Sequence, residues 1–251
     1  MGGVARRATK IAEVRKQGGN MLLLDAGDSL ASDQDPALKS QGRTSIQAMN
    51  MMGYDAMTLG PLDLALGAAV LQQRIAEARF AVLSANAVIA ATGQPLTRPF
   101  VVREWGGRKV AIVGLSGGGT NEIATQDPLK TAQTVVPQAR QQAEAVILLS
   151  HAGMDMDRQI AESVPGIALI VSGGSSTFES PWRSAQTGAW LWHADEAQPN
   201  HAGRMLGIGS LTIDLSGRVS HHAWNVVGLG PEIADDPKMA EWVIQQGEEQ
   251  P

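Results

Sequence analysis

Carboxylate and imidazole side chains follow two apolar runs of the sequence. Asp25 and Asp28 close the run that begins at Met21, and His151 directly follows Ala145 to Ser150. Such runs are typical of buried parallel strands, and parallel strands deliver their last residues to one edge of a sheet, where ligands bind. Carboxylates and imidazoles at that edge coordinate metal ions, cap backbone amides or pair with charged groups. Asp28 and His151 are therefore the first candidates for a functional site.

Other chemically capable residues have simpler explanations. We interpret Asp25 as a backbone cap and Asp63 as an acid at a helix N-terminus, where the helix dipole favours negative charge. Asp155, Asp157 and His201 are further metal ligands only if folding brings them beside His151. These residues therefore extend the candidate list without defining a site.

Two patterns do not carry the chemistry that they first suggest. The loop Gly114 to Thr120 has enough glycine to approach a phosphate, but it lacks GxGxxG spacing, so an ordinary loop is favoured. His221 and His222 are adjacent on an expected strand, so their side chains point to opposite faces and do not share one metal.

Aromatic residues of one segment are assigned to core packing rather than to a groove: Trp182, Trp190, Trp192 and His193. A methionine group is also assigned to the core: Met49, Met51, Met52 and Met57.

The composition excludes several classes of partner. The chain has 251 residues, a formal charge of -5 and no cysteine. An acidic chain lacks the basic face that binds nucleic acid or an anionic membrane, and a cysteine-free chain has no thiolate nucleophile or disulfide framework. Its longest apolar runs, such as Ala143 to Ser150, are far shorter than the roughly 18 residues of a membrane helix. These short runs predict no membrane-spanning segment, and residues 1–10 lack the apolar region of a signal peptide.

Helices and strands are expected to alternate through the first two thirds of the chain. The expected helices include residues 4–12, 46–52, 70–78 and 130–143, with another that closes at residues 160–164, and the expected strands fall near 21–25, 55–59, 80–84, 145–150 and 167–171. This alternation predicts a largely parallel sheet, to which a hairpin at 100–104 and 109–114 adds antiparallel strands. Residues 189–193, 205–214 and 219–227 are predicted to form antiparallel strands, before a last helix at 237–246.

The strand-end motifs, taken together and in order, resemble one known family. They lie in the segments Asp25-Ala26-Gly27-Asp28, Met49 to Ala56, Leu83 to Asn86, Leu149 to Gly153 and Ser172 to Thr177. The chain resembles the amino-terminal domain of the 5′-nucleotidase family, within the calcineurin-like metallophosphoesterases. The resemblance covers essentially the whole chain. It implies an α/β fold, a four-layer αββα sandwich of two mixed sheets. We expect residues 1–251 to form a single such domain, without the C-terminal nucleotide-binding domain that the family has.

The family's catalytic residues are matched only in part. The resemblance implies two divalent metals, which activate a water and clamp a phosphate. Asp28 matches the bridging carboxylate and His151 matches one histidine ligand. The other family positions carry different residues: Pro61 for the Asn ligand, Leu62 for the general-acid His, Asp63 for the Glu, and Gly174 and Ser176 for two histidines. The Asp-x-His pair of a leading strand has no counterpart. Proline, leucine and glycine offer no side-chain ligand atom.

These departures lead to two functional hypotheses. The first is a non-catalytic binding or assembly module with a protein partner, no cofactor, and Asp28 and His151 as vestigial metal ligands. The alternative is a metal-dependent phosphomonoesterase or nucleotidase using Mn, Zn or Mg at a rearranged or partner-completed site. The resemblance suggests an extracytoplasmic location. Without the leading strand, we expect an unpaired sheet edge beside Leu22 to Asp25.

Overall fold

The computed structural model describes residues 3–31, 37–174, 176, 180–194, 204–214 and 216–248. Its helices are α1 (Val4–Lys16), α2 (Arg43–Met52), α3 (Pro61–Leu64), α4 (Ala68–Glu77), α5 (Pro128–Arg140), α6 (Met154–Ser163) and α7 (Pro237–Glu248). Its strands are β1 (Leu24–Asp25), β2 (Ala56–Thr58), β3 (Ala81–Leu83), β4 (Ala87–Ile89), β5 (Phe100–Trp105), β6 (Arg108–Leu115), β7 (Ile123–Thr125), β8 (Ala145–Ser150), β9 (Ile167–Ser172), β10 (Trp182–Arg183), β11 (Trp190–His193), β12 (Met205–Ile213) and β13 (Val219–Gly228).

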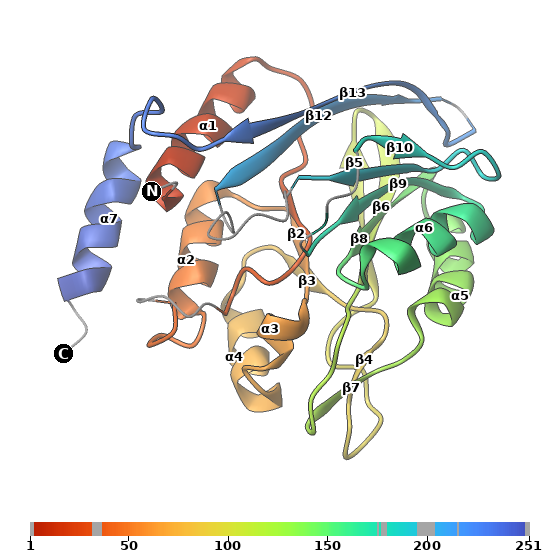
Figure 1. Ribbon diagram of the computed structural model, residues 1–251, viewed down its shortest axis with the longest axis horizontal. Helices are drawn as coiled ribbons and strands as arrows, with labels where there is room; N and C mark the ends of the chain where they lie inside the picture. Colours follow the sequence, from red (N-terminus) through yellow and green to blue (C-terminus); the bar gives the residue numbers. More distant parts are fainter. Residues whose placement is uncertain are drawn as a thin grey trace.

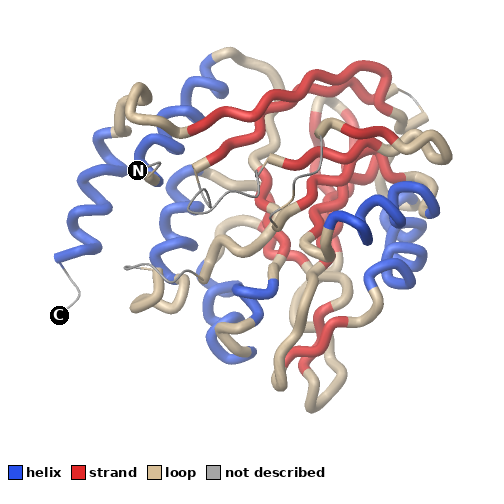
Figure 2. Tube along the Cα trace, viewed as in Figure 1, coloured by secondary structure: helices blue, strands red, loops and turns tan. Residues whose placement is uncertain are grey.

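Two sheets form the centre of the fold (Figures 1 and 2). The smaller has the order β1-β2-β3, and its strands are all parallel. The larger has the order β10-β11-β9-β8-β6-β5, with four parallel strands and antiparallel strands at both edges. Two antiparallel pairs, β4–β7 and β12–β13, complete the strands described. The predicted α/β fold class is confirmed, although the smaller sheet is parallel rather than mixed along its described strands.

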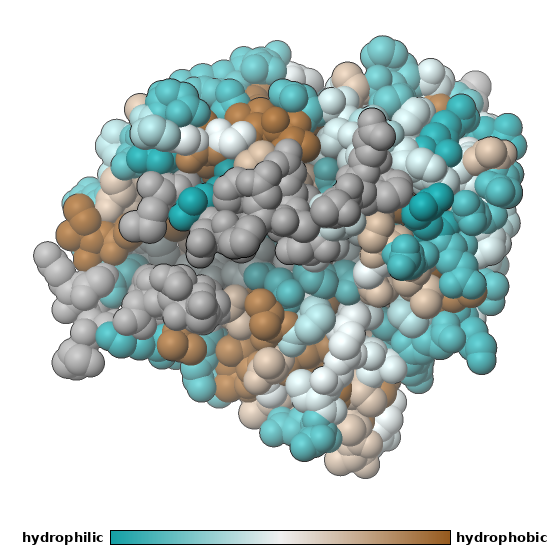
Figure 3. Space-filling view, viewed as in Figure 1, coloured by the Kyte–Doolittle hydropathy of each residue, from teal (hydrophilic) through white to brown (hydrophobic). Residues whose placement is uncertain are grey.

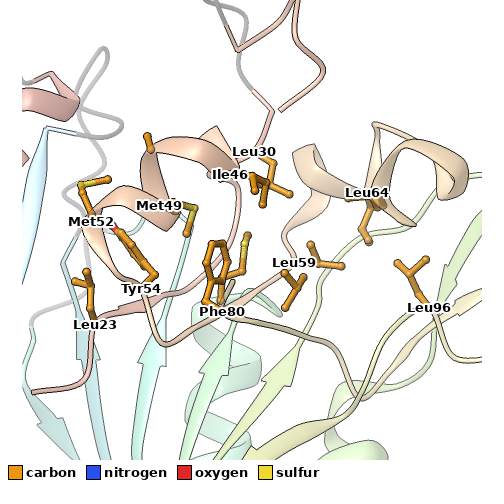
Figure 4. Packing of buried hydrophobic residues seen from close by; sticks show 14 of the residues in the cluster. Leu23, Leu30, Ile46, Met49, Met52, Tyr54, Leu59, Leu64, Phe80 and Leu96 are labelled. Carbon is orange, nitrogen blue, oxygen red and sulfur yellow. The ribbon is translucent and has the colours of Figure 1, made fainter. Parts of the chain in front are cut away.

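Three groups of buried side chains separate the layers. One fills the space between the smaller sheet and the helices α1 and α2; Figure 4 shows part of it, including Tyr54 and Phe80. A second lies between the larger sheet and the helices α5 and α6. The third lies between the sheets and includes Leu83, Ile112 and Trp192. The order of layers is therefore helices, sheet, sheet, helices, and the β12–β13 hairpin contributes Leu211 and Trp224 to the middle group.

Some local predictions were wrong, each for an identifiable reason. The strand β11 is antiparallel to β10 as expected but parallel to β9, because β10 runs opposite to β9 at the sheet edge before the chain turns into β11. Met51 is 49% exposed, because it lies on the solvent side of α2 while Met49 and Met52 face the core. The run from Met21 forms only a two-residue strand that is half-buried, because it lies at the edge of its sheet.

The outer edge of β1 faces no other strand among the described residues. Leu23 directs both its backbone groups toward the β2 side, since its amide donates to Asp55 and its carbonyl accepts from the Asp55 amide. Because successive residues of a strand direct these groups to alternate sides, the Leu22 and Leu24 amides point to the open edge. This agrees with the open edge expected from the sequence.

We therefore predict a contrast in hydrogen exchange along this strand. In isolated monomer, the amides of Leu22 and Leu24 should exchange at least about tenfold faster than those of Leu23 and Asp25, because only the latter point toward β2. Residue-resolved exchange by NMR measures this, with Leu148 in the buried strand β8 as the protected reference. Equal protection of Leu22 and Leu24 would show that another segment covers the edge.

Candidate functional site

Asp28 is held at the end of β1 by a strained turn. Its φ is 61°, a left-handed conformation that is uncommon for residues other than glycine. The buried carboxylate of Asp63 stabilises this turn by accepting from the amides of Asp28 at 2.8 Å and Leu30 at 2.9 Å. It also accepts from the Gly60 amide at 3.0 Å, at the start of α3. Burial raises the pKa of Asp63 to about 6, although the hydrogen bonds from Gly60 and Leu30 oppose this.

Asp28 and His151, the first candidates from the sequence, meet at this point. The Asp28 carboxylate accepts from the Leu62 amide through Oδ1 at 2.8 Å, and its Oδ2 lies 3.1 Å from Nε2 of His151. The side chain of His151 is 8% exposed and that of Asp28 is 24% exposed. The predicted meeting of strand ends is therefore correct for Asp28 and His151. The side chain of Leu62 points elsewhere and is 54% exposed, so only its backbone joins the site.

Both ring nitrogens of His151 face acceptors. Nδ1 lies 2.6 Å from the Ala26 carbonyl oxygen, and Nε2 faces the Asp28 carboxylate. A ring that donates from both nitrogens is an imidazolium, so this geometry is that of an ion pair. Burial alone would lower the pKa of His151, but the hydrogen bond and charge of Asp28 and the Ala26 carbonyl raise it above its usual value.

Two glycines leave room for the His151 ring. A Cβ on Gly27 would lie 2.8 Å from Nδ1 of His151, and one on Gly173 would lie 2.6 Å from the same atom. Gly27 also has a φ of 98°, whereas Gly173 does not lie among the residues of positive φ. A third close contact lies opposite Asp28, where a Cβ on Gly60 would lie 2.1 Å from Oδ1. Because glycine has no side chain, these three positions leave the space that the His151 ring and the Asp28 carboxylate fill.

Gly173→Ala should lower the free energy of unfolding by about 1–3 kcal/mol, because the new methyl group overlaps both the His151 ring and the Ala26 carbonyl. Urea denaturation measures the change. Gly3→Ala is the matched control, since nothing lies within 4 Å of a Cβ there, and it should stay within about 0.5 kcal/mol of wild type. A Gly173→Ala variant as stable as that control would contradict the described packing.

The remaining acidic candidates serve the backbone and neighbouring hydroxyls. Asp25 accepts from the Gly27 amide at 3.0 Å and from the Ser29 hydroxyl at 2.8 Å, which confirms its interpretation as a cap. Asp63 lies in the first turn of α3, as predicted. Asp155 is exposed on α6. His201 lies outside the described residues.

Asp157 is fully buried, and both of its carboxylate oxygens accept hydrogen bonds from serines. Its carboxylate accepts from the hydroxyls of Ser150 and Ser172, each at 2.5 Å. Burial raises its pKa to about 6, against the lowering effect of these hydrogen bonds. Asp157 therefore does not supply a third ligand to the Asp28–His151 pair.

The residues described do not fit a dinuclear metal centre. The 3.1 Å between Asp28 Oδ2 and His151 Nε2 is close to the spacing of two adjacent ligands that each lie about 2.1 Å from one ion. Within the described ranges, however, no three His, Asp or Glu residues cluster as a metal site. A Cβ on Gly174 would lie 3.6 Å from Nε2 of His151, so this family ligand position lies beside His151 but has no side chain.

The glycine-rich loop after β6 forms one rim of the site, which sequence reasoning did not anticipate. A Cβ on Gly118 would lie 3.0 Å from the Pro61 side chain, and a Cβ on Gly117 would lie 2.2 Å from the His151 carbonyl oxygen. The glycines therefore permit close backbone packing. Figure 3 shows apolar residues at the surface over α3 and α4, next to this rim. The only sequence signal was the glycine content of the loop.

The aromatic segment belongs to the core, as predicted. Trp192 stacks on Trp224 with ring centroids 4.7 Å apart, and Trp190 lies 3.5 Å from the ring of His222. Because His222 packs against Trp190 while His221 is exposed, the two histidines face opposite sides of β13. They do not form a shared metal site.

Comparison with known proteins relates the chain to phosphoesterases. No family model matches it. It is 31% identical over 265 residues to human 5′-nucleotidase, an alignment that covers 95% of this chain and 46% of the human protein. Its structure is similar to that of the sulfate thiohydrolase SoxB of Thermus thermophilus, with a TM-score of 0.84 and 26% identity over 97% of this chain and 46% of that chain. The calcineurin-like phosphoesterase YfkN of Bacillus subtilis shares the fold, with a TM-score of 0.80 and 21% identity over 98% of this chain and 88% of that chain.

The αββα layers and the strand-end position of Asp28 and His151 define a calcineurin-like metallophosphoesterase fold. Within that class, the chain is homologous to curated 5′-nucleotidases over 94–95% of its length. It spans about half the length of the curated relatives that it matches. None of the helices in the described residues is long and apolar enough to cross a membrane.

Proposed function

We propose that this domain is a non-catalytic member of its family that acts as a binding or assembly module. The observation that carries the proposal is the closed pairing of Asp28, whose two carboxylate oxygens are already engaged by the Leu62 amide and by His151. In this arrangement the ion pair replaces the bridging role that the resemblance assigns to the carboxylate. Two ligating side chains do not hold the two ions that the family chemistry requires.

The position of the general acid supports the same proposal. Leu62 occupies it and cannot transfer a proton to a leaving group. Its side chain is 54% exposed, so a protein bound beside the Asp28 turn would meet an apolar group there. The proposed partner is therefore another protein, and no nucleic acid is expected from an acidic chain.

A hydrolysis assay tests this proposal. Purified protein with a generic phosphomonoester and added manganese should release no more phosphate than a blank without protein. Asp28→Ala tests any residual activity, and Asp155→Ala, which removes an exposed carboxylate of α6, is its matched control. Hydrolysis that Asp28→Ala abolishes and Asp155→Ala preserves would overturn the proposal.

The alternative is a metal-dependent phosphomonoesterase or nucleotidase with a rearranged or partner-completed site. The short distance between Asp28 and His151 favours it, because it is compatible with two ligands of one ion. Equilibrium dialysis with manganese, zinc or magnesium distinguishes the two. Stoichiometric binding that is lost in Asp28→Ala supports the alternative, and no binding at millimolar metal argues against it.

The organisation of the chain is also a proposal. We infer that residues 1–251 act as one domain in an extracytoplasmic location. The continuous burial from α1 to α7 supports the single domain, since α7 contributes Met239 to the same core as α1. The family relationship supports the location.

A further inference from the structure

Asp157 is a buried carboxylate whose hydrogen bonds go to neither Asp28 nor His151. It lies in the first turn of α6 and is 0% exposed. Its two oxygens accept from two neutral hydroxyls, those of Ser150 and Ser172, at 2.5 Å each. Burying a charge is costly, so a carboxylate retained in such a place needs a reason beyond packing.

The two serines occupy equivalent places on neighbouring strands. Ser150 ends β8 and Ser172 ends β9, and the two residues are paired in the parallel register. The chain then continues to His151 in one strand and to Gly173 in the other. The Gly173 amide donates to the Ser150 carbonyl at 2.7 Å, and the Ser150 hydroxyl accepts from the Ala152 amide at 3.2 Å. One carboxylate therefore joins both strand ends at the point where they enter the site.

The His151 ring depends closely on where Gly173 lies. A Cβ on Gly173 would lie 2.6 Å from Nδ1 of His151 and 2.3 Å from the Ala26 carbonyl oxygen, which is the acceptor of that same nitrogen. The ring, its acceptor and the Gly173 backbone are thus in close contact. A movement of a few tenths of an ångström at Ser172 therefore changes the space available to the ring.

We propose that Asp157 is a positioning residue for His151: by holding Ser150 and Ser172 together, it fixes the imidazole against the Ala26 carbonyl and the Asp28 carboxylate. A carboxylate suits this task because it accepts from both hydroxyls at once, whereas an amide has one acceptor and one donor group. The role is independent of whether the site holds a metal, so it goes beyond the proposed function.

The test follows the Nδ1 proton of His151, which the Ala26 carbonyl protects from exchange with solvent. Histidine labelled with ¹⁵N reports this proton by NMR, and His151→Asn assigns it. At one fixed pH, Asp157→Asn and Ser172→Ala should each speed its exchange by about tenfold or more, because each removes one part of the link. The Ser172→Ala variant retains the carboxylate and so separates position from charge.

Two controls separate positioning from general stability. Asp155→Asn changes an exposed carboxyl of the same helical turn, and Ile160→Val makes a small cavity on the buried side of α6 while Asp157 and both serines stay in place. Both should leave exchange of the His151 proton within about twofold of wild type. Faster exchange in Asp157→Asn alone would assign the effect to charge and overturn the proposal. Unchanged exchange in both test variants, with lower thermal stability, would show a merely structural role and also overturn it.

Discussion

Asp63→Ala is expected to lower the free energy of unfolding by about 3–5 kcal/mol, among the largest effects of any single substitution in this chain. The wild-type carboxylate accepts from the amides of Asp28, Leu30 and Gly60, and it is 0% exposed. Alanine leaves these donors without a partner, and each buried unsatisfied amide costs about 1–3 kcal/mol. The strained φ of Asp28 would also lose the contact that holds it.

Urea denaturation with two companion variants makes this prediction specific. Leu62→Ala changes the preceding, exposed residue and should stay within about 0.5 kcal/mol of wild type. Asp63→Asn keeps one acceptor oxygen and should fall between the two. A loss below about 1 kcal/mol for Asp63→Ala would mean that water satisfies the three amides and that Asp63 does not organise the turn.

Asp63 connects two segments of the site through backbone contacts alone. The resemblance aligns Asp63 with a Glu of the family turn, beside Pro61 and Leu62 where an Asn and a His are expected. The structure makes this carboxylate the connection between the β1 turn and the start of α3. Its bonds go to backbone amides, which are present whatever the neighbouring side chains are.

The sequence predicts the elements whose signals are local. Gly53 ends α2 in a left-handed conformation, as its position after the apolar face indicated. The glycine pair between β5 and β6 forms the expected turn, with φ of 61° at Gly106 and 74° at Gly107. The all-apolar run Ala145–Ser150 is a fully buried strand. Each signal acts within a few residues, so the rest of the fold does not override it.

Features that depend on distant contacts were not predictable in the same way. The four-residue α3 and the two-residue β10 are too short to show a periodic pattern. The direction of β11 depends on how the preceding segment returns to the sheet, which its alternating residues do not record. At the site, strand order placed Asp28 and His151 at one edge, but the contact of His151 with Ala26 required the three-dimensional arrangement.

The chain is expected to be more stable at mildly acidic pH than at alkaline pH. Burial raises the pKa of Asp63 and Asp157 from 3.8 to about 6 in the folded state. Below the ordinary pKa of 3.8, each carboxyl is protonated in both the folded and the unfolded state, and its stabilising contribution to folding is complete. This contribution is lost as the pH rises through the folded-state pKa of about 6. His151 acts in the same direction, because its pKa is raised and its pairing with Asp28 weakens once the ring loses its proton. The lowered pKa values of Glu144 and Asp214 change the free energy of unfolding only at lower pH.

The free energy of unfolding should therefore fall by about 4 kcal/mol between pH 4.5 and pH 8, about 2 from each buried aspartate. Urea denaturation at intervals of half a pH unit measures this slope. Asp157→Asn removes one titrating group and should reduce the fall by about half, whereas Asp155→Asn, on the exposed side of the same turn, should leave it unchanged. Stability that rises over this range would show that Asp63 and Asp157 are ionised in the folded protein at little cost. Their amide and hydroxyl donors would then outweigh burial, and the carboxylates would be strong fixed acceptors at every pH in the range.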